Sequence, residues 1–463
     1  MMRLTRLTSI VFFLFLMNAC APYYVRHQRF LKLVATEKYA EAETTLTSTK
    51  KAKKKKLKLL FLLEMGYVTF AQGKYSESSK YFAEADYLIE DYKKNLGYEA
   101  LAIIVNPGVK PYKAEDFEVV MLHYFNAMNY LKQRDFENAL VECRRMNLSL
   151  ITMAEKLKDK PKYKEDAFAH LLMGLTYEGS GDINNAFIAY RNAYDIYAGD
   201  YTSFFEMKIP EQLKKDLVRT AAANGFRNEE ELYRKKFGYS STDTLPKANK
   251  TELVLFWNNG LGPYKEQWSI DFNLVKQGDQ FVFMNSGLGY SFPFPVSSVS
   301  QQDAKNLSQL SVYRIAFPRY VHRPMMYRSA RASLGGANYP FEIAENIDAI
   351  AFKSLNDRFA REMGSALIRF AVKKAAEVAL RKENKDAATV LSIANAISEQ
   401  ADTRNWQTLP NQISYTRIPL IPGKNEVLFY ATAAQGGRTR CDTIRIDARK
   451  GQVYYEIVNT VNR

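Results

Sequence analysis

The spacing of apolar residues divides the chain into two halves. Up to about residue 240, apolar side chains recur every three or four residues, which predicts a succession of amphipathic helices. The stretch STDTLPKANK, 241–250, is polar and helix-breaking, which indicates a boundary. Beyond it, alternating stretches such as LSVYRIAFPRY and QFVFMNSGLGYSFPFPV predict strands. The pattern therefore predicts an all-α domain over 20–240 and a strand-rich domain over 250–463.

The helical half contains a repeated pattern. In HLLMGLTYEGSGDINNAFIAYRNAYDIY, small residues stand where two helices would touch, at the offsets of a tetratricopeptide repeat (TPR). The stretches LLEMGYVTFAQGKYSESSKYFAEAD and MLHYFNAMNYLKQRDFENALVECRRM follow the same plan, and a weaker copy surrounds ATEKYAEAETTL. Ordinary helix pairs share this periodicity, but four copies of a Tyr/Phe-x-x-Ala phrase favour a repeat. The predicted packing residues are Gly66, Ser78, Ala85, Ala127, Ala139, Gly174, Tyr177, Ala186 and Ala193.

Two insertions interrupt these repeats, around NLGYEALAIIVNPGVKPYKAEDF and around EKLKDKPKYKED. In VNPGVKPY, Pro107-Gly108 predicts a turn and Pro111 excludes a helix, so a fixed loop should cross the helices, either as a structural plug or as part of a binding surface. Stacked helix pairs present a concave face to a peptide or a partner domain and do not usually perform chemistry. We therefore expect a protein partner to bind the repeat surface.

The strand-rich half should also contain helices. Its first two strands are predicted on either side of a turn at Asn259-Gly260. Apolar residues between Ile350 and Val378 recur at helical spacing, and a second helix is predicted over 390–397, so the two should form a helical hairpin. Strands return in RIPLIPGKNEVLFYATA and TRCDTIRIDARKGQVYYEIVNTV. The predicted fold class is TPR-like repeats followed by an α+β domain, with a β-sandwich-like layer and an inserted helical hairpin.

The first residues resemble a bacterial lipoprotein signal. Two arginines precede an apolar run over 10–17 that is too short to span a bilayer, and Ala19 and Cys20 follow it. This resembles a lipobox, in which residues 1–19 are removed and the cysteine is lipidated. The absence of an aspartate or an acidic run after Cys20 favours the periplasmic face of the outer membrane. A secretory signal cut elsewhere and an uncleaved anchor are the alternatives.

The chain is strongly basic, with 65 Lys and Arg against 50 Asp and Glu and a formal net charge of +15. Such a surface favours nucleic acid, anionic lipids or acidic polymers, and export excludes nucleic acid. The lysines are most concentrated in KKAKKKKLK, 50–58, close to the predicted lipid. A lipid and a basic patch could act together on one membrane surface, although a solvated helix start is the favoured interpretation.

No catalytic or metal-binding motif is present in the sequence. The glycine clusters NNGLGP and NSGLGY lack the lysine and the spacing of phosphate loops, and there is no G-x-S-x-G or H-E-x-x-H motif. The four histidines are isolated in sequence from one another and from any pair of cysteines. The carboxylates of Asp271, Glu342 and Glu345 are the candidates for an acid and base pair, but their spacing carries no signal. We therefore predict a non-enzymatic protein without a metal or cofactor.

The phrase ADTRNWQTLP, 401–410, is distinctive without matching a catalytic pattern. Arg404 beside Trp406 could stack on a ligand or hold its carboxylate, which makes the two residues a possible binding site. The favoured interpretation is a rigid connector, in which the tryptophan is buried and the arginine binds carbonyl groups at a helix end.

The phrases VNPGVKPYKAEDFE and ADTRNWQTLP, together with the lipobox and the repeats, resemble a largely uncharacterised family of bacterial outer-membrane lipoproteins. The resemblance covers most of the chain after Cys20 and implies a role in cell-envelope or peptidoglycan assembly, but it supplies no functional residues. The combined prediction is a lipid-anchored adaptor that binds a protein partner, with peptidoglycan as a further candidate partner. The alternatives are a glycan- or peptide-acting enzyme in the C-terminal half and a cell-wall polymer-binding module.

Overall fold

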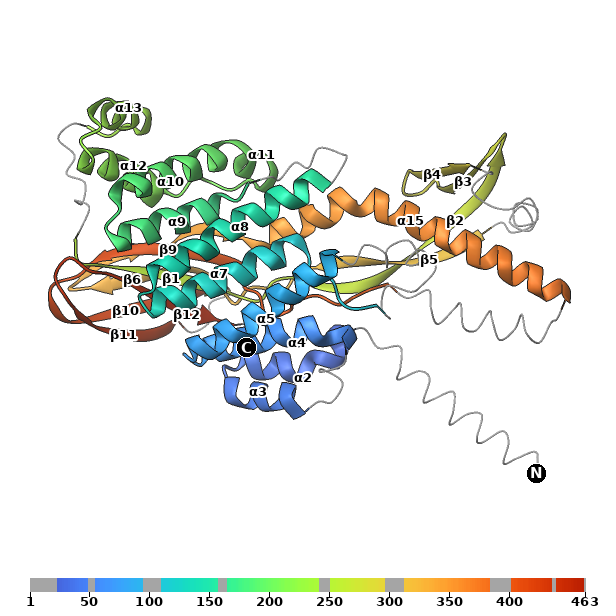
Figure 1. Ribbon diagram of the computed structural model, residues 1–463, viewed down its shortest axis with the longest axis horizontal. Coiled ribbons are helices and arrows are strands. Elements are labelled where there is room, and N and C mark those ends of the chain that lie inside the picture. Colours follow the sequence, from blue (N-terminus) through green and yellow to red (C-terminus); the bar gives the residue numbers. More distant parts are fainter. Residues whose placement is uncertain are drawn as a thin grey trace.

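A computed structural model describes residues 23–48, 55–94, 110–156, 165–240, 250–295, 312–383, 401–434 and 439–461. A stack of helices lies along a pair of packed β-sheets, and a long helix with a third sheet extends from one end (Figure 1). The described part of the chain is thus a set of TPR-like helix pairs followed by a mixed α+β region. This confirms the predicted fold class at that level.

The helical part consists of antiparallel pairs joined by short turns. Helices α4 and α5, α7 and α8, and α9 and α10 form its central pairs. The second helix begins four residues after the first one ends in the first two pairs, and three residues after it in the third. The described helices are α2 Tyr23–Ala35, α3 Tyr39–Ser48, α4 Lys58–Ala71, α5 Tyr75–Lys94, α7 Asp116–Lys132, α8 Phe136–Lys156, α9 Ala167–Ser180, α10 Ile183–Ile196, α11 Thr202–Phe205, α12 Glu211–Ala223 and α13 Arg227–Phe237, with a 3-10 turn at Lys55–Leu57 and a π-helical turn at Tyr197–Tyr201.

Small residues lie where the helices of a pair meet. A Cβ atom on Gly66 would overlap the ring of Phe82, and a Cβ on Gly174 would lie 3.0 Å or less from three ring atoms of Tyr190. The hydroxyl of Ser78 donates to the carbonyl of Gly66 at 2.7 Å. The other predicted packing residues are buried apart from the half-buried Tyr177, and they are Ala85, Ala127, Ala139, Ala186 and Ala193.

The strands of the C-terminal half form three four-stranded sheets. We call them the inner sheet, with strand order β12-β1-β9-β8, the outer sheet, with order β11-β10-β6-β7, and the arm sheet, with order β4-β3-β2-β5. Strand β1 is parallel to β12 and antiparallel to β9. The strands are β1 Glu252–Asn259, β2 Tyr264–Gln277, β3 Gln280–Asn285, β4 Tyr290–Pro295, β5 Val312–Val321, β6 Tyr327–Leu334, β7 Ala337–Pro340, β8 Glu342–Asn346, β9 Gln412–Pro419, β10 Gly423–Ala433, β11 Arg440–Ala448 and β12 Val453–Thr460.

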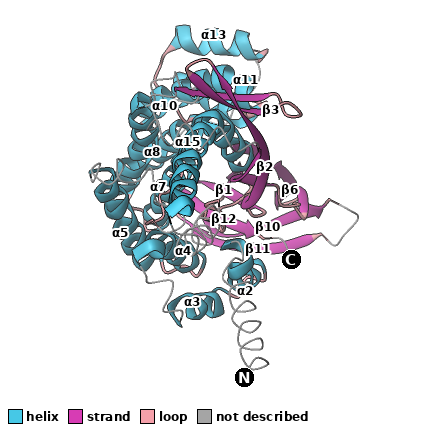
Figure 2. Cartoon of the chain, turned by 90° about the vertical axis from the view of Figure 1, so that its right-hand side faces the viewer, coloured by secondary structure: helices cyan, strands magenta, loops and turns pink. Residues whose placement is uncertain are grey.

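The inner sheet lies between the helices and the outer sheet (Figure 2). All eight residues of β1 are buried, because successive side chains of a strand point to opposite faces and both faces are covered. Leu255 and Trp257 pack with Phe429 of the outer sheet, whereas Val254 and Phe256 belong to the core shared with the helices. The two packed sheets are the predicted β-sandwich-like layer.

Helix α15, Ile347–Glu383, joins this layered body to the arm sheet. Its first turns contribute Ile350 and Leu355 to the core shared by helices and inner sheet. Farther along, Met363 and Leu367 pack against the apolar face of the arm sheet, which includes Phe272. The helix therefore supports the arm that extends to the right in Figure 1.

The two strands predicted around the Asn259-Gly260 turn region are β1 and β2. They lie in different sheets, because β1 pairs with β12 and β9 whereas β2 pairs with β3 and β5. The second helix of the predicted hairpin, over 390–397, lies outside the described residues. So do Cys20 and the signal, the boundary residues 241–249, and most of both insertions.

Candidate functional site

The first helices of two central pairs, α4 and α7, are buried on all sides along most of their length. Every residue from Phe117 to Asn129 of α7 is buried, as is every residue from Leu62 to Phe70 of α4. A helix that is apolar all round must be covered on every face. In the usual arrangement of such repeats these helices would line an open concave surface. In this chain that surface is covered.

The inner sheet provides much of the cover. The hydroxyl of Tyr455 on β12 donates to the carbonyl of Leu175 on α9 at 2.6 Å, and the Tyr124 hydroxyl on α7 donates to Asn258 on β1 at 3.1 Å. A Cβ on Gly179 would overlap the Tyr455 side chain, so glycine permits this close approach. The repeat helices and the strands thus share one apolar core.

A buried ion cluster, which we call the Arg417 cluster, joins the same two parts. Arg417 on β9 pairs with Glu178 on α9 at 2.9 Å, with Glu252 on β1 at 2.6 Å and with Asp216 on α12 at 3.0 Å. Arg219 pairs with Glu178 and with Asp216. Burial alone would raise the pKa of the Glu178 carboxyl. The positive charges of Arg219 and Arg417 outweigh that effect, so the pKa is lowered to about 2. Five charges from both halves are therefore enclosed together.

A second cluster, the Glu115–Glu118 cluster, lies at the start of α7. Glu115 pairs with Lys265 of β2 and with Arg358 of α15. Burial opposes ionisation of Glu115, but Lys265 and Arg358 outweigh it and lower its pKa to about 2. Burial, followed by the charge of Glu115, raises the pKa of Glu118 to about 7.

Two neighbouring carboxyls with separated pKa values are a pattern found in acid–base catalysis. Here the Glu118 oxygens accept from the backbone nitrogens of Trp406 and Glu115, at 2.7 and 2.9 Å, and from the Tyr112 hydroxyl. The Glu115 oxygens are occupied by Lys265 and Arg358. The cluster therefore connects α7, β2, α15 and the 401–410 segment, and its carboxylate oxygens are already bonded within the chain.

Arg404 and Trp406 are engaged inside the protein. The guanidinium of Arg404 donates to the carbonyls of Lys56 and Lys110, both at 2.9 Å, and to the carboxylate of Asp402. Trp406 is only 1% exposed and packs against Phe82 and Phe125. The phrase ADTRNWQTLP thus connects the strand half to the starts of α4 and α7.

The three candidate carboxylates do not form one paired site. Asp271 pairs with Arg314 on the exposed side of the arm sheet, whereas Glu342 and Glu345 lie on β8. Glu345 accepts from the Tyr201 hydroxyl at 3.0 Å, and burial together with the Asp166 charge raises its pKa well above the ordinary value.

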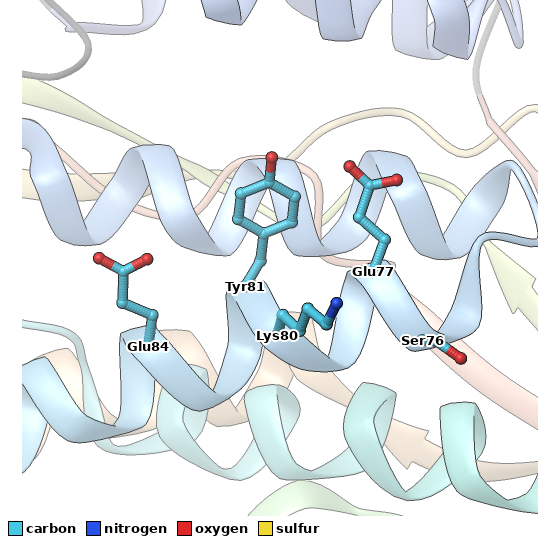
Figure 3. A pocket seen from close by; sticks show the side chains of 5 residues that line it. All are labelled: Ser76, Glu77, Lys80, Tyr81 and Glu84. Carbon is cyan, nitrogen blue, oxygen red and sulfur yellow. The ribbon is translucent and has the colours of Figure 1, made fainter.

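The second helices of the pairs, α5, α8 and α10, form the outer face of the stack. Apolar side chains exposed on them are Tyr87 (75%), Leu148 (60%), Val141 (44%) and Ile188 (36%). A hollow of about 590 Å³ lies along α5. Among the side chains that line it, Glu77 and Tyr81 point to the same side (Figure 3). Burial and the charge of Glu77 raise the pKa of the Tyr81 hydroxyl. This hollow is lined by Ser76, Glu77, Lys80, Tyr81 and Glu84.

A second hollow, of about 770 Å³, lies beside the edge strand β8. It is lined by apolar and charged residues of the connection between α11 and α12, including Met207 and Ile209, by Glu211 and Lys214 of α12, and by residues of β8, including Ile343. Within the described residues, no group of three or more His, Cys, Asp or Glu side chains is arranged to hold a metal ion. None of the helices in the described ranges is long and apolar enough to cross a membrane.

Sequence reasoning did not find the covered concave surface or the two ion clusters. The clusters carry no local signal, because Glu178 and Arg417 are 239 residues apart. The covered concave surface does leave a local signal in the sequence. In LLFLLEMGYVTFA the apolar residues occupy every side of the helix, whereas an open concave surface would require a polar stripe.

Comparison with known proteins gives only distant likenesses. No family model matches the chain, and no curated protein matches it. Among solved structures, the nearly identical TPR-like repeats assigned to a kinesin light chain of Podosopora anserina match with 13% identity and a TM-score of 0.29, and a variant of them with 15% and 0.30. Each match covers 46% of this chain and 91% of that chain. The fold itself defines a helical-repeat protein with a strand-rich C-terminal half packed on its repeats.

Proposed function

We propose that the chain is a non-enzymatic scaffold that binds a protein partner through the outer face of its repeats. In this proposal a lipid on Cys20 tethers it to the periplasmic face of the outer membrane, where it serves cell-envelope or peptidoglycan assembly. The observation that carries the proposal is the burial of α7, because a repeat whose inner helices are covered by its own chain has only its outer helices open to another protein.

The outer face has features that suit a partner. Tyr87 on α5 and Leu148 on α8 belong to neighbouring helix pairs, and both are largely exposed to solvent. Tyrosine is among the residue types enriched at protein interfaces. Arg144, four residues before Leu148 on α8, adds a polar group, and its guanidinium donates to the Tyr177 hydroxyl at 2.9 Å. Apolar anchors within a polar rim are the usual arrangement of a protein interface.

Site-specific photo-cross-linking in living cells tests the partner surface. A benzophenone amino acid replaces Tyr87 or Leu148 in the full chain, and the matched control replaces Thr443, which is exposed on β11 of the outer sheet. We expect one discrete cross-linked protein from the first two positions and none from the third. Cross-links only from Thr443, or from none of the three, would contradict the proposed surface.

Metabolic labelling with palmitate tests the anchor. We expect label on the wild-type chain, no label on Cys20→Ala, and undiminished label on the control Cys441→Ala, which alters an exposed thiol in the strand half. Membrane fractionation of the same three strains should release only Cys20→Ala from the outer membrane. Equal labelling of all three chains would disprove lipidation at Cys20.

A further inference from the structure

The starts of α2 and α4 lie at the same end of the helical stack. His27 on α2 contacts Glu64 on α4, with 2.8 Å between Nε2 and Oε1, which fixes the register of the two helices. Glu43, in the first turns of α3, bonds Gln72 and Lys74 just beyond the end of α4. Because α3 runs back along both helices, α2 and α4 are parallel, and their first residues are neighbours in space (Figure 1).

This end is the part of the stack closest along the chain to the proposed lipid. Tyr23, the first residue of α2, follows Cys20 by three residues. Three residues span at most about 10 Å even when fully extended. A lipid on Cys20 would therefore keep the start of α2, and with it the start of α4, at the membrane surface.

Basic side chains gather at the same end. Lys55 and Lys56 are exposed in the turn that precedes α4. The backbone nitrogen of Tyr112 donates to the carbonyl of Lys56, and Arg404 bonds the carbonyls of Lys56 and Lys110, so the segment before α7 lies beside this turn. That segment adds the half-exposed Lys110 and the exposed Lys113.

Three carboxylates near this end are paired with cations other than Lys55 and Lys56. Glu84 pairs with Lys58 at 2.6 Å, and Asp402 pairs with Arg404 at 2.6 Å. Glu115 is enclosed by its two partners in the Glu115–Glu118 cluster. None of these three carboxylates is paired with Lys55 or Lys56.

We propose that this end of the stack, around Lys55 and Lys56, binds the headgroups of anionic phospholipids. The inference rests on the proposed lipid anchor, which would hold the start of α2 close enough to the membrane for the exposed lysines to reach its headgroups. Each lysine close to an anionic surface strengthens binding about fivefold. The start of the repeats would then face the membrane, with the outer helices still open to a partner.

Vesicle binding by the chain from residue 20 onward, carrying Cys20→Ala so that no lipid contributes, tests the proposal. The vesicles contain either phosphatidylethanolamine with phosphatidylglycerol or phosphatidylcholine alone. The test variant is Lys55→Glu with Lys56→Glu, which keeps the backbone carbonyl that Arg404 binds. The control is Lys235→Glu with Lys236→Glu, two exposed lysines on α13 at the other end of the stack (Figure 1). Equal thermal unfolding midpoints establish that both variants are folded.

We expect salt-sensitive binding to the phosphatidylglycerol vesicles, weakened roughly 25-fold or more by the test variant and far less by the control. Equal weakening by both variants would show that net charge alone acts, and would overturn the proposal. It would also be overturned if the test variant lost binding to isolated sacculi while keeping its vesicle binding. Palmitate labelling of Cys20 is read separately, so failure of the anchor and failure of the basic surface give different results.

Discussion

At position 174, the absence of a side chain sets the distance between α9 and α10. The ring of Tyr190 occupies the space that a Cβ would fill, and that ring is fully buried. Gly199, in the π-helical turn that follows α10, has nothing within 4 Å of a Cβ. Because both glycines lie in helical segments, comparing an alanine substitution at the two positions separates the effect of crowding from the effect of helix propensity.

We predict that Gly174→Ala lowers the free energy of unfolding by about 1–3 kcal/mol relative to Gly199→Ala, because added volume in a packed core forces neighbours to move. Denaturant unfolding of the full chain measures the difference. Equal free energies of unfolding for the two variants would mean that α9 and α10 do not approach this closely.

Glu345 makes the stability of the fold depend on pH. Burial and the neighbouring Asp166 raise its pKa, so the folded chain keeps a proton that the unfolded chain releases above the ordinary value of 4.5. Its contribution to stability is complete below that value and decreases as the pH rises, by about 1.4 kcal/mol per pH unit for one retained proton.

The substitution Glu345→Gln removes this titration and can keep the bonds to the Asn346 backbone nitrogen and the Tyr201 hydroxyl. We expect the thermal unfolding midpoint of Glu345→Gln to fall less between pH 5 and pH 8 than that of the wild-type chain. Glu426→Gln, on the exposed side of β10, should leave the wild-type difference unchanged. A wild-type pH dependence that persists in Glu345→Gln would contradict the assignment.

Single residues differ in how much the sequence could reveal about them. The packing residues of the repeats were predictable, because Gly174 and Ala186 belong to one helix pair and their spacing is local. The sequence favoured a carbonyl-binding role for Arg404, but the partners of Arg404 and Arg417 could not be predicted. Their partners come from segments that only the complete fold brings near, such as Lys56, 348 residues before Arg404.

At the scale of elements, the Arg417 cluster joins α9 and α12 to β1 and β9. Arg417 touches three carboxylates and is only 6% exposed. Removing one partner of a buried ion group leaves charge uncompensated, which costs about 3–5 kcal/mol. The exposed pair of Arg445 and Glu426 on the outer sheet is the matched comparison, since such pairs contribute about 0–1 kcal/mol.

We therefore predict that Arg417→Met destabilises the chain by about 3–5 kcal/mol in denaturant unfolding, and Arg445→Met by less than about 1 kcal/mol. Adding Glu252→Gln to Arg417→Met should recover part of the loss, because it removes one of the unpaired charges. A small effect of Arg417→Met would mean that the helices and the inner sheet do not depend on this cluster.

The positions of strands were easier to predict than the pairing of strands into sheets. The alternation in β2 and β5 identified both strands, but pairing depends on which elements cover each face. Strands β11 and β12 are similarly adjacent in sequence and lie in different sheets. The sequence therefore predicted the strand-rich composition of the second half and not its division into three sheets.

At the scale of the whole molecule, the repeats and the inner sheet form one body. The buried apolar residues of α4, α7 and α9 continue into β1, β9 and β12 without a gap. The two domains predicted from the sequence are joined by this shared core and by both ion clusters. The arm formed by α15 and the arm sheet projects from the common body (Figure 1).

Hydrogen exchange of the full chain, followed peptide by peptide, tests the covered concave surface most directly. If the inner sheet covers the repeats, amides of α7 and α9 exchange as slowly as those of β1, because all three open only when the shared core opens. Amides in the exposed α13 should exchange faster. Rapid exchange in α7 and α9 while β1 remains protected would show that the repeats and the inner sheet are separate, and would contradict the account.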